Sequence, residues 1–169
     1  SSSAAMTCST ALALDDVDGL GYGDSDAGRV TLINAAIKSE NEMAGASTGG
    51  LDQNASMRCT AGHALLLDCR PELTPLENVS QQEFDLDKYN LELLVVDTQA
   101  PHQLNDGQYA QRRATCEEAA KILGVATLRV TADGISKADD QFQALKETLD
   151  ALPDETMKKR VRHVVTEIE

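Results

Sequence analysis

The sequence predicts an α+β chain, in which an α/β first part is followed from about residue 105 by a mostly helical second part. Two short apolar runs in the first part, "GHALLLDCR" and "LELLVVDT", are bounded by polar or turn residues and indicate buried strands. After "APHQLNDG", apolar residues recur at helical spacing. With 169 residues and a hydrophobic content of 41%, the chain has room for one ordinary domain or two small halves.

The elements of the first part follow from local signals. A helix is predicted over residues 3–14, and the glycines of "DDVDGLGYGD" end it. A second helix is predicted in "DSDAGRVTLINAAIKSENEMAG", where Asp26 can cap the start and Gly45 can end it. Its apolar face consists of Val30, Ile33 and Ile37. Between the two apolar runs, the proline-containing "PELTPLENVSQQEFD" indicates an edge strand.

The second part is predicted to contain helices over residues 108–123, over residues 137–152 and from Asp154 onward. The last of these has an apolar stripe of Met157, Val161, Val164 and Ile168. Its basic run "MKKRVRH" is the densest in the chain, but neighbouring acidic residues dilute it. A solvated helix face is therefore favoured over a binding site.

Charge and cysteine spacing limit the partners. The net charge of −13 and the pI of about 4.5 repel nucleic acid and anionic lipid, and no basic patch offsets this. No run approaches the roughly 18 apolar residues that span a bilayer, and we expect no secretory leader. The cysteines, Cys8, Cys59, Cys69 and Cys116, lack the paired spacing of zinc or redox motifs. We therefore expect reduced thiols, a cytoplasmic location, and neither nucleic acid nor a membrane as a partner.

Two polar segments could bind phosphate or metal. The serines of "SSSAA" open a helix, where unpaired amides and the helix dipole attract anions, although serine is also an ordinary N-cap. Glu40 follows a serine near the end of the second helix, and a carboxylate with a hydroxyl suits Mg²⁺. The alternative for Glu40 is a solvated acidic helix end.

Two further residues could contact a substrate. Asp52 follows Gly49 and Gly50, which allow the backbone to approach a ligand closely, so its carboxylate can be held at a defined position. The alternative is an N-cap for a short helix through "QNASMR". Tyr109 opens a helix after a glycine turn and could recognise a sugar, and the alternative is a packed tyrosine.

The order of these segments is informative as a whole. "SSSAA", "ENEMAGASTGGLDQ", "GHALLLDCR", "VVDTQAPHQLNDGQYAQRRATCEEAAKILG" and "RVRHVVTE" together resemble the galactokinase family of the GHMP kinase superfamily over nearly the whole chain. The resemblance implies a GHMP kinase-like α+β fold. Residues 1–105 would form the later half of the N-terminal domain, a mixed sheet with helices similar to domain 2 of ribosomal protein S5. Residues 106–169 would form the helical start of the C-terminal domain.

The resemblance also implies roles for individual residues. Ser1, Ser2 and Ser3 correspond to the end of the phosphate-binding loop for ATP, and Ser3 and Glu40 to the Mg²⁺ ligands. Asp52 corresponds to the catalytic aspartate, and Gly49, Asp52 and Tyr109 to sugar-binding positions. The implied reaction is ATP-dependent phosphorylation of galactose at its anomeric hydroxyl, with galactose and ATP as partners and a monomer as the expected assembly.

The chain departs from the family pattern in places. The first family motif, the glycines before "SSS" and the later glycine-rich motif are absent, so we expect little or no activity from this chain alone. Pro101 and Gln103 flank His102 where the family has a basic residue and a serine, which favours a structural histidine. Two alternatives are a noncatalytic galactose and ATP sensor and a related sugar 1-kinase.

Overall fold

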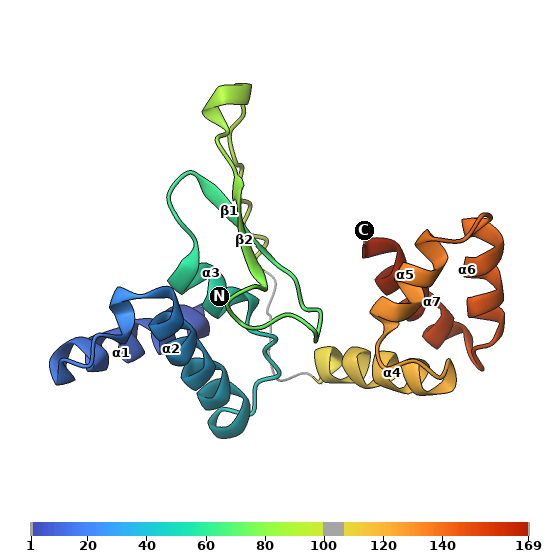
Figure 1. The fold of residues 1–169 in the computed structure, drawn as a ribbon, viewed down its shortest axis with the longest axis horizontal. Helices are drawn as coiled ribbons and strands as arrows, with labels where there is room; N and C mark the ends of the chain where they lie inside the picture. Colours follow the sequence, from blue (N-terminus) through green and yellow to red (C-terminus); the bar gives the residue numbers. More distant parts are fainter. Residues whose placement is uncertain (1, 100–106, 169) are drawn as a thin grey trace. The chain divides into compact units, whose positions relative to one another are not determined.

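The chain is described by a computed structural model, which covers residues 2–99 and 107–168, with the side chain of Ser2 excepted. It contains two compact units, Ser1–Leu104 (unit 1) and Asn105–Glu169 (unit 2), and each is considered by itself. The described residues form seven α-helices and a two-stranded antiparallel sheet, so the fold is mixed in α and β (Figure 1). The assignment of the two units to GHMP kinase domains stays a prediction.

Unit 1 contains three α-helices, three short helical segments and the two strands. In chain order these are α1 (Ser2–Asp18), η1 (Tyr22–Asp24), α2 (Asp26–Lys38), η2 (Ser39–Met43), α3 (Leu51–Arg58), β1 (His63–Leu67), β2 (Val79–Glu83) and η3 (Asp87–Tyr89). The three α-helices contact one another, and their small apolar core consists of Cys8, Ile33, Ala36 and Met57.

The first helix is longer than predicted. It continues past Leu14 to Asp18, and Gly19 then ends it. Glycine can do so because it adopts the left-handed φ of +64° at low cost. The Gly19 amide donates to the carbonyl of Asp16, and the Leu20 amide to that of Asp15, which is the Schellman pattern of a helix end. The prediction that glycines end this helix is therefore confirmed, although the helix ends at Asp18 and not at Leu14.

The start of α2 corrects one prediction. Ser25, and not Asp26, is the N-cap: its hydroxyl accepts a hydrogen bond from the Gly28 amide at 3.1 Å. Asp26 is the first residue of the helix, and its side chain pairs with Arg58 instead. At the other end, α2 passes into the π-helical turn η2, and Gly45 follows it with a φ of +68°. The prediction that Gly45 ends this helix is confirmed.

Strands β1 and β2 pair antiparallel, with His63 opposite Glu83 and Leu67 opposite Val79. Both strand positions are confirmed, but the predicted burial of β1 is wrong, since Leu66 is 56% exposed. The second apolar run is also wrong as a strand: residues 91–98 have no regular secondary structure, and Leu94 is 84% exposed. A strand needs a partner edge for its backbone groups, and this run pairs with no described strand.

Unit 2 is entirely helical in its described part: α4 (Gln108–Ile122), α5 (Leu128–Ser136), α6 (Gln141–Asp150) and α7 (Glu155–Glu167). The first and last helices were predicted nearly to the residue, and α6 begins four positions later than expected, at Gln141. Helix α5 was not predicted. Its sequence has β-branched residues and a glycine, which favour helix weakly, and the burial of Leu128 and Ala132 one turn apart stabilises it.

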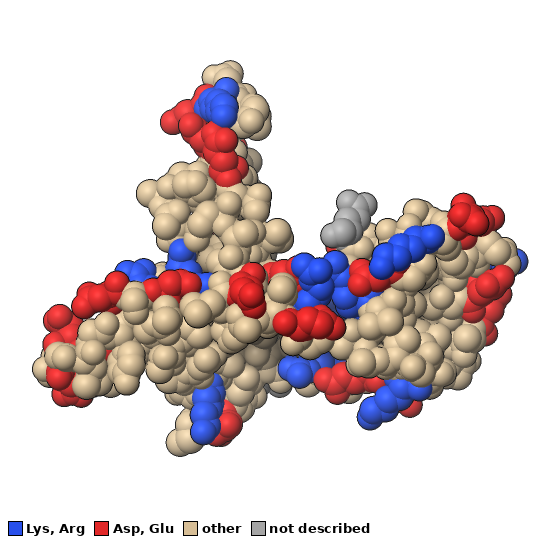
Figure 2. Space-filling view, in the orientation of Figure 1, with Lys and Arg blue, Asp and Glu red and all other residues tan. Residues whose placement is uncertain are grey.

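The core of unit 2 is apolar, and its buried residues are Ala119, Ala120, Leu128, Ala132, Leu149, Leu152, Met157, Val161 and Val165. The predicted stripe of α7 contributes Met157 and Val161 to it, and Val164 and Ile168 pack against it. From the same helix, Arg160 reaches the Gln111 carbonyl at 3.2 Å, so the basic run is only partly solvated. Acidic and basic side chains lie beside one another on the visible face (Figure 2). Among the described helices, none has the length and apolar character needed to cross a membrane.

Candidate functional site

Glu40 and Ser3, the two predicted metal ligands, lie in contact. The Ser3 hydroxyl, in the first turn of α1, donates to Oε2 of Glu40 at 2.9 Å. Thr7, one turn further along the same helix, donates to Oε1 at 2.9 Å. Glu40 is only 4% exposed, so its alternative interpretation as a solvated acidic helix end is wrong.

A third donor to Glu40 comes from α3. The side-chain amide of Gln53 donates to Oε1 of Glu40 at 2.7 Å, and Gln53 is fully buried. A buried carboxylate is costly unless hydrogen bonds compensate for the lost water, and two helices provide those bonds here. We call Ser3, Thr7, Glu40 and Gln53 the Glu40 cluster.

Backbone conformation explains how Glu40 comes to face α1 and α3. Glu40 lies in η2, a π-helical turn in which the Ala44 amide donates to the carbonyl of Ser39, five residues earlier. Such turns re-aim side chains relative to a regular α-helix and are frequent at functional sites. The following loop is fixed by Asn41, whose Oδ1 accepts from the Thr48 amide at 2.8 Å.

Gly50 permits α3 to approach α2 closely. Its φ is +89°, and a Cβ at this position would lie 2.7 Å from Cδ1 of Ile37. The backbone conformation therefore favours glycine, and a side chain here would also displace the end of the Ile37 side chain. Gly49, the predicted sugar-binding glycine, is exposed in the loop before it.

Asp52 is the second residue of α3, and Gly50 occupies the N-cap position. The interpretation of Asp52 as the N-cap of a short helix is thus wrong, although the helix itself exists. Asp52 is exposed, whereas Gln53 beside it is buried against Glu40. The helix thereby presents a carboxylate at the surface immediately next to the Glu40 cluster.

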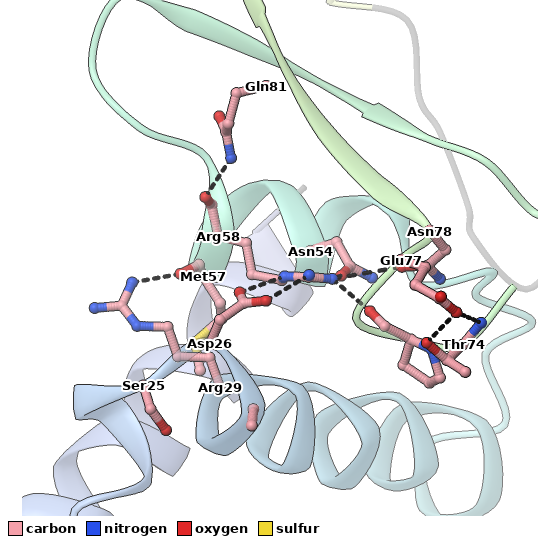
Figure 3. A network of polar contacts seen from close by, with 12 residues as sticks. Ser25, Asp26, Arg29, Asn54, Met57, Arg58, Thr74, Glu77, Asn78 and Gln81 are labelled. Carbon is pink, nitrogen blue, oxygen red and sulfur yellow. Dashed lines mark hydrogen bonds and ion pairs between the residues drawn. The ribbon is translucent and has the colours of Figure 1, made fainter.

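The far end of α3 is tethered by a buried arginine (Figure 3). Nε and Nη2 of Arg58 donate to the two carboxylate oxygens of Asp26, each at 2.7 Å. Nη1 donates to the carbonyl of Pro75 at 2.9 Å and to Oδ1 of Asn54 at 3.1 Å. Such a bidentate ion pair fixes the orientation of the two side chains as well as the distance between them. The helix that contains Asp52 is therefore bound to α2 at its C-terminal end.

The remaining predicted residues lie either outside the described residues or in unit 2. Ser1 and the side chain of Ser2 lie outside the described residues, as do Pro101, His102 and Gln103. Tyr109 is the second residue of α4 in unit 2 and is 54% exposed, so the alternative of a packed tyrosine is wrong. The cluster thus brings together Ser3 and Glu40 and places them against the helix of Asp52.

Sequence reasoning missed Thr7 and Gln53. Thr7 is four positions after Ser3, a spacing that puts both on one helix face, and this signal could have found it. Gln53 had no local signal beyond its place after Asp52. Among the described residues, no group of three or more His, Cys, Asp or Glu side chains could hold a metal ion.

Cys8 lies near the cluster but is not a candidate nucleophile. Burial raises the pKa of the Cys8 thiol, and the Glu40 carboxylate raises it further, while a hydrogen bond with Ser56 acts in the opposite direction. The reactive form of cysteine is the thiolate, which this environment disfavours.

Comparison with known proteins adds an independent observation. No family model matches the chain. Several curated proteins named galactokinase are similar to it, and three of them are described. That of Streptomyces coelicolor (strain ATCC BAA-471 / A3(2) / M145) is 41% identical over 172 aligned positions, which cover 100% of this chain and 39% of that protein. That of Streptomyces lividans is 40% identical, with 82% and 32% covered, and that of Haemophilus influenzae (strain PittEE) is 35% identical, with 86% and 34% covered. The chain thus spans about two fifths or less of the length of these relatives.

Proposed function

This chain belongs to the galactokinase family, and from that premise we propose that the whole protein transfers the γ-phosphoryl group of ATP to the anomeric hydroxyl of galactose. The products are galactose 1-phosphate and ADP, and the reaction is the first committed step of galactose catabolism. The observation that supports this most directly is the Glu40 cluster. It joins a serine at a helix start, a buried carboxylate and the helix of Asp52 in one unit.

The cluster fits a magnesium ion by the chemistry of its donors. Mg²⁺ prefers oxygen ligands, keeps several waters and is commonly bound by one or two carboxylates plus substrate phosphates. Ser3 Oγ and Glu40 Oε2, which lie 2.9 Å apart, are two such oxygens, and these residues would hold the ion. When bound, Mg²⁺ offsets the negative charge that the transferring phosphoryl group and the leaving ADP share.

The start of α1 would bind the nucleotide phosphates. The first amides of a helix have no acceptor within it, and the helix dipole adds positive character there. Ser1, Ser2 and Ser3 would add hydroxyl donors at the same position. In a chain of net charge −13, this helix end supplies attraction for ATP that the overall charge does not.

Asp52 would act on the sugar. Its carboxylate accepts a hydrogen bond from the C1 hydroxyl of galactose and so orients that oxygen toward the γ-phosphorus. As the new P–O bond forms, the bond from phosphorus to the β–γ bridging oxygen breaks and ADP leaves. The hydroxyl proton passes to Asp52 in the same process. Gly49 and Tyr109 would contribute to sugar binding.

The test is ADP release by the whole protein, followed with a coupled assay. Reactions contain galactose, its C2 and C4 epimers, or no sugar. We expect ADP release that depends on galactose and is slower with either epimer. Binding of galactose and ATP without ADP release would replace the proposal with a noncatalytic sensor, and preference for an epimer would replace it with a related sugar 1-kinase. The cytoplasmic location and monomeric state stay predictions.

A further inference from the structure

We propose that Gln53 is a positioning residue that, together with Thr7, holds one oxygen of Glu40 in place and thereby couples the metal ligand to the helix of Asp52. The inference rests on the proposed function, because it assumes that Glu40 is a metal ligand. It concerns residues that do not themselves touch the metal or the sugar.

The two oxygens of Glu40 have different partners. Oε1 accepts from Gln53 at 2.7 Å and from Thr7 at 2.9 Å, whereas Oε2 accepts from Ser3. Thr7 has a single hydroxyl hydrogen, which the Ser3 carbonyl also attracts at 3.0 Å. Gln53 is therefore the stronger anchor of Oε1. With Oε1 held, Oε2 is directed toward the Ser3 hydroxyl, the other proposed ligand.

The orientation of the Gln53 amide follows from its neighbours. A carboxylate only accepts hydrogen bonds, so the nitrogen of the amide must face Glu40. The amide oxygen then accepts from the Thr48 hydroxyl at 3.4 Å, and that hydroxyl oxygen accepts from the Gly50 amide at 3.3 Å. Gln53 thus contacts the metal ligand on one side and the loop before α3 on the other.

The position of the Gln53 backbone also determines the position of Asp52. The two residues are adjacent in the first turn of α3, so a shift of the Gln53 backbone moves Asp52 with it. The C-terminal end of the same helix is tethered through Arg58 to Asp26. Because this tether and the contacts of α3 with α1 and α2 remain when the Gln53 contact is lost, we expect the loss to act mainly on Glu40.

The principal variant is Gln53→Met in the whole protein, which keeps the side chain's length and removes its hydrogen bonds. Partners of metal ligands typically contribute about 10–100-fold to metal affinity, and we expect the half-saturating Mg²⁺ concentration to rise by that factor. Saturating Mg²⁺ should restore most of kcat. A purely structural role predicts the opposite, a loss of kcat that Mg²⁺ does not restore.

The matched control is Gln143→Met. Gln143 also donates its amide to a glutamate, Glu147, at 2.8 Å, but on the exposed surface of α6 in unit 2. Its half-saturating Mg²⁺ concentration should stay within about twofold of the unmodified protein. A shift in the control as large as that in Gln53→Met would overturn the inference.

Metal binding can be measured without turnover. Mn²⁺, which favours the same oxygen ligands, can be titrated in the presence of a nonhydrolysable ATP analogue and followed by electron paramagnetic resonance. We expect weaker Mn²⁺ binding for Gln53→Met, and unchanged binding would contradict the inference. If Gln53→Met does not fold, Thr7→Val tests the same anchoring of Oε1. Removing one hydrogen bond to a charged group predicts about a tenfold weaker Mn²⁺ affinity, and no change there also overturns it.

A double-mutant cycle with Glu40→Gln separates this inference from the proposed function. If Glu40→Gln by itself leaves Mg²⁺ dependence unchanged, the proposed metal site fails. If Glu40→Gln weakens Mg²⁺ binding but Gln53→Met does not, only the present inference fails. Because Gln53 acts through Glu40, Gln53→Met should have little further effect in the Glu40→Gln background, and additive effects would count against it.

Discussion

Unit 1 and unit 2 bury different kinds of side chain. Among the described residues, every buried polar or charged one belongs to unit 1: Asp15, Glu40, Gln53, Asn54 and Arg58. The buried residues of unit 2 are all apolar. Polar contacts are directional, whereas apolar packing depends mainly on volume and shape. The buried polar contacts of unit 1 therefore fix the positions of individual side-chain atoms, whereas unit 2 is stabilised by apolar packing.

This difference fits the proposal that the catalytic aspartate and the metal ligands lie in unit 1. Its apolar core is small, and its helices are oriented by the Glu40 cluster and by the Arg58–Asp26 pair. Such contacts cost much when one partner is lost, because the other is left without compensation. Substitutions in the two units should therefore differ in kind as well as in size.

The largest effect is expected for Asp52→Asn. An amide cannot accept the hydroxyl proton, and general base catalysis typically contributes about 10²–10⁴-fold, so kcat of the whole protein should fall by that factor. ATP binding should be nearly unchanged, since we propose that the nucleotide binds at the start of α1. A coupled ADP assay and a fluorescent ATP analogue measure the two quantities. Near-normal turnover would remove Asp52 as the base.

The next effect is on stability in unit 1. Asp26→Ala leaves the buried Arg58 guanidinium without its carboxylate, and we expect a loss of about 3 kcal/mol in the free energy of unfolding, at the low end for a broken buried pair because Asp26 is half exposed. Arg58→Met should cost less, because the remaining Asp26 carboxylate can be hydrated. Urea denaturation of both variants checks the order. The reverse order would mean that Asp26, not Arg58, is the costly partner to leave unpaired.

A conservative change in unit 2 should be milder. Leu149→Met keeps the volume of a residue that is only 4% exposed, and such exchanges typically cost less than about 1.5 kcal/mol. The same denaturation experiment measures it. A loss of stability equal to that of Asp26→Ala would contradict the expected difference between the polar contacts of unit 1 and the apolar core of unit 2.

The smallest effect concerns alkaline pH. Burial raises the pKa of both Cys8 and Cys116 above the ordinary 9.0. Glu40 raises the pKa of Cys8 further, by more than the hydrogen bond with Ser56 lowers it. Arg160 lowers the pKa of Cys116 by more than Glu117 raises it. A raised pKa in the folded state contributes stability that is present below pH 9.0 and is lost as pH rises through the folded value.

The slope of unfolding free energy against pH, measured above pH 9.0, tests this. Cys8→Ala should flatten that slope more than Cys116→Ala, because neighbouring groups on balance add to the pKa shift of Cys8 and reduce that of Cys116. Equal flattening would indicate that burial alone, common to both units, sets the two shifts. The absolute stability of each variant is a separate matter, since either change also removes a packed sulfur atom.

Local signals in the sequence were sufficient for many elements. Gly45 ended a helix, the apolar run at β1 formed a strand, and the periodic pattern of α7 matched its buried face. These features depend on neighbours within a few residues, so they can be read without the fold. The run at residues 91–98 failed for the converse reason: whether an apolar segment becomes a strand depends on a partner edge elsewhere.

By itself, the sequence determined which residue types were available for the chemistry: serines at a helix start, a carboxylate at position 40 and an aspartate at position 52 shortly after two glycines. Only the tertiary structure decided that Glu40 is buried and not solvated. Its donors Thr7 and Gln53 lie 33 and 13 positions away, and no local pattern encodes such contacts. Burial of a charge is a property of the assembled helices, because hydrogen bonds from distant segments offset the cost of removing it from water.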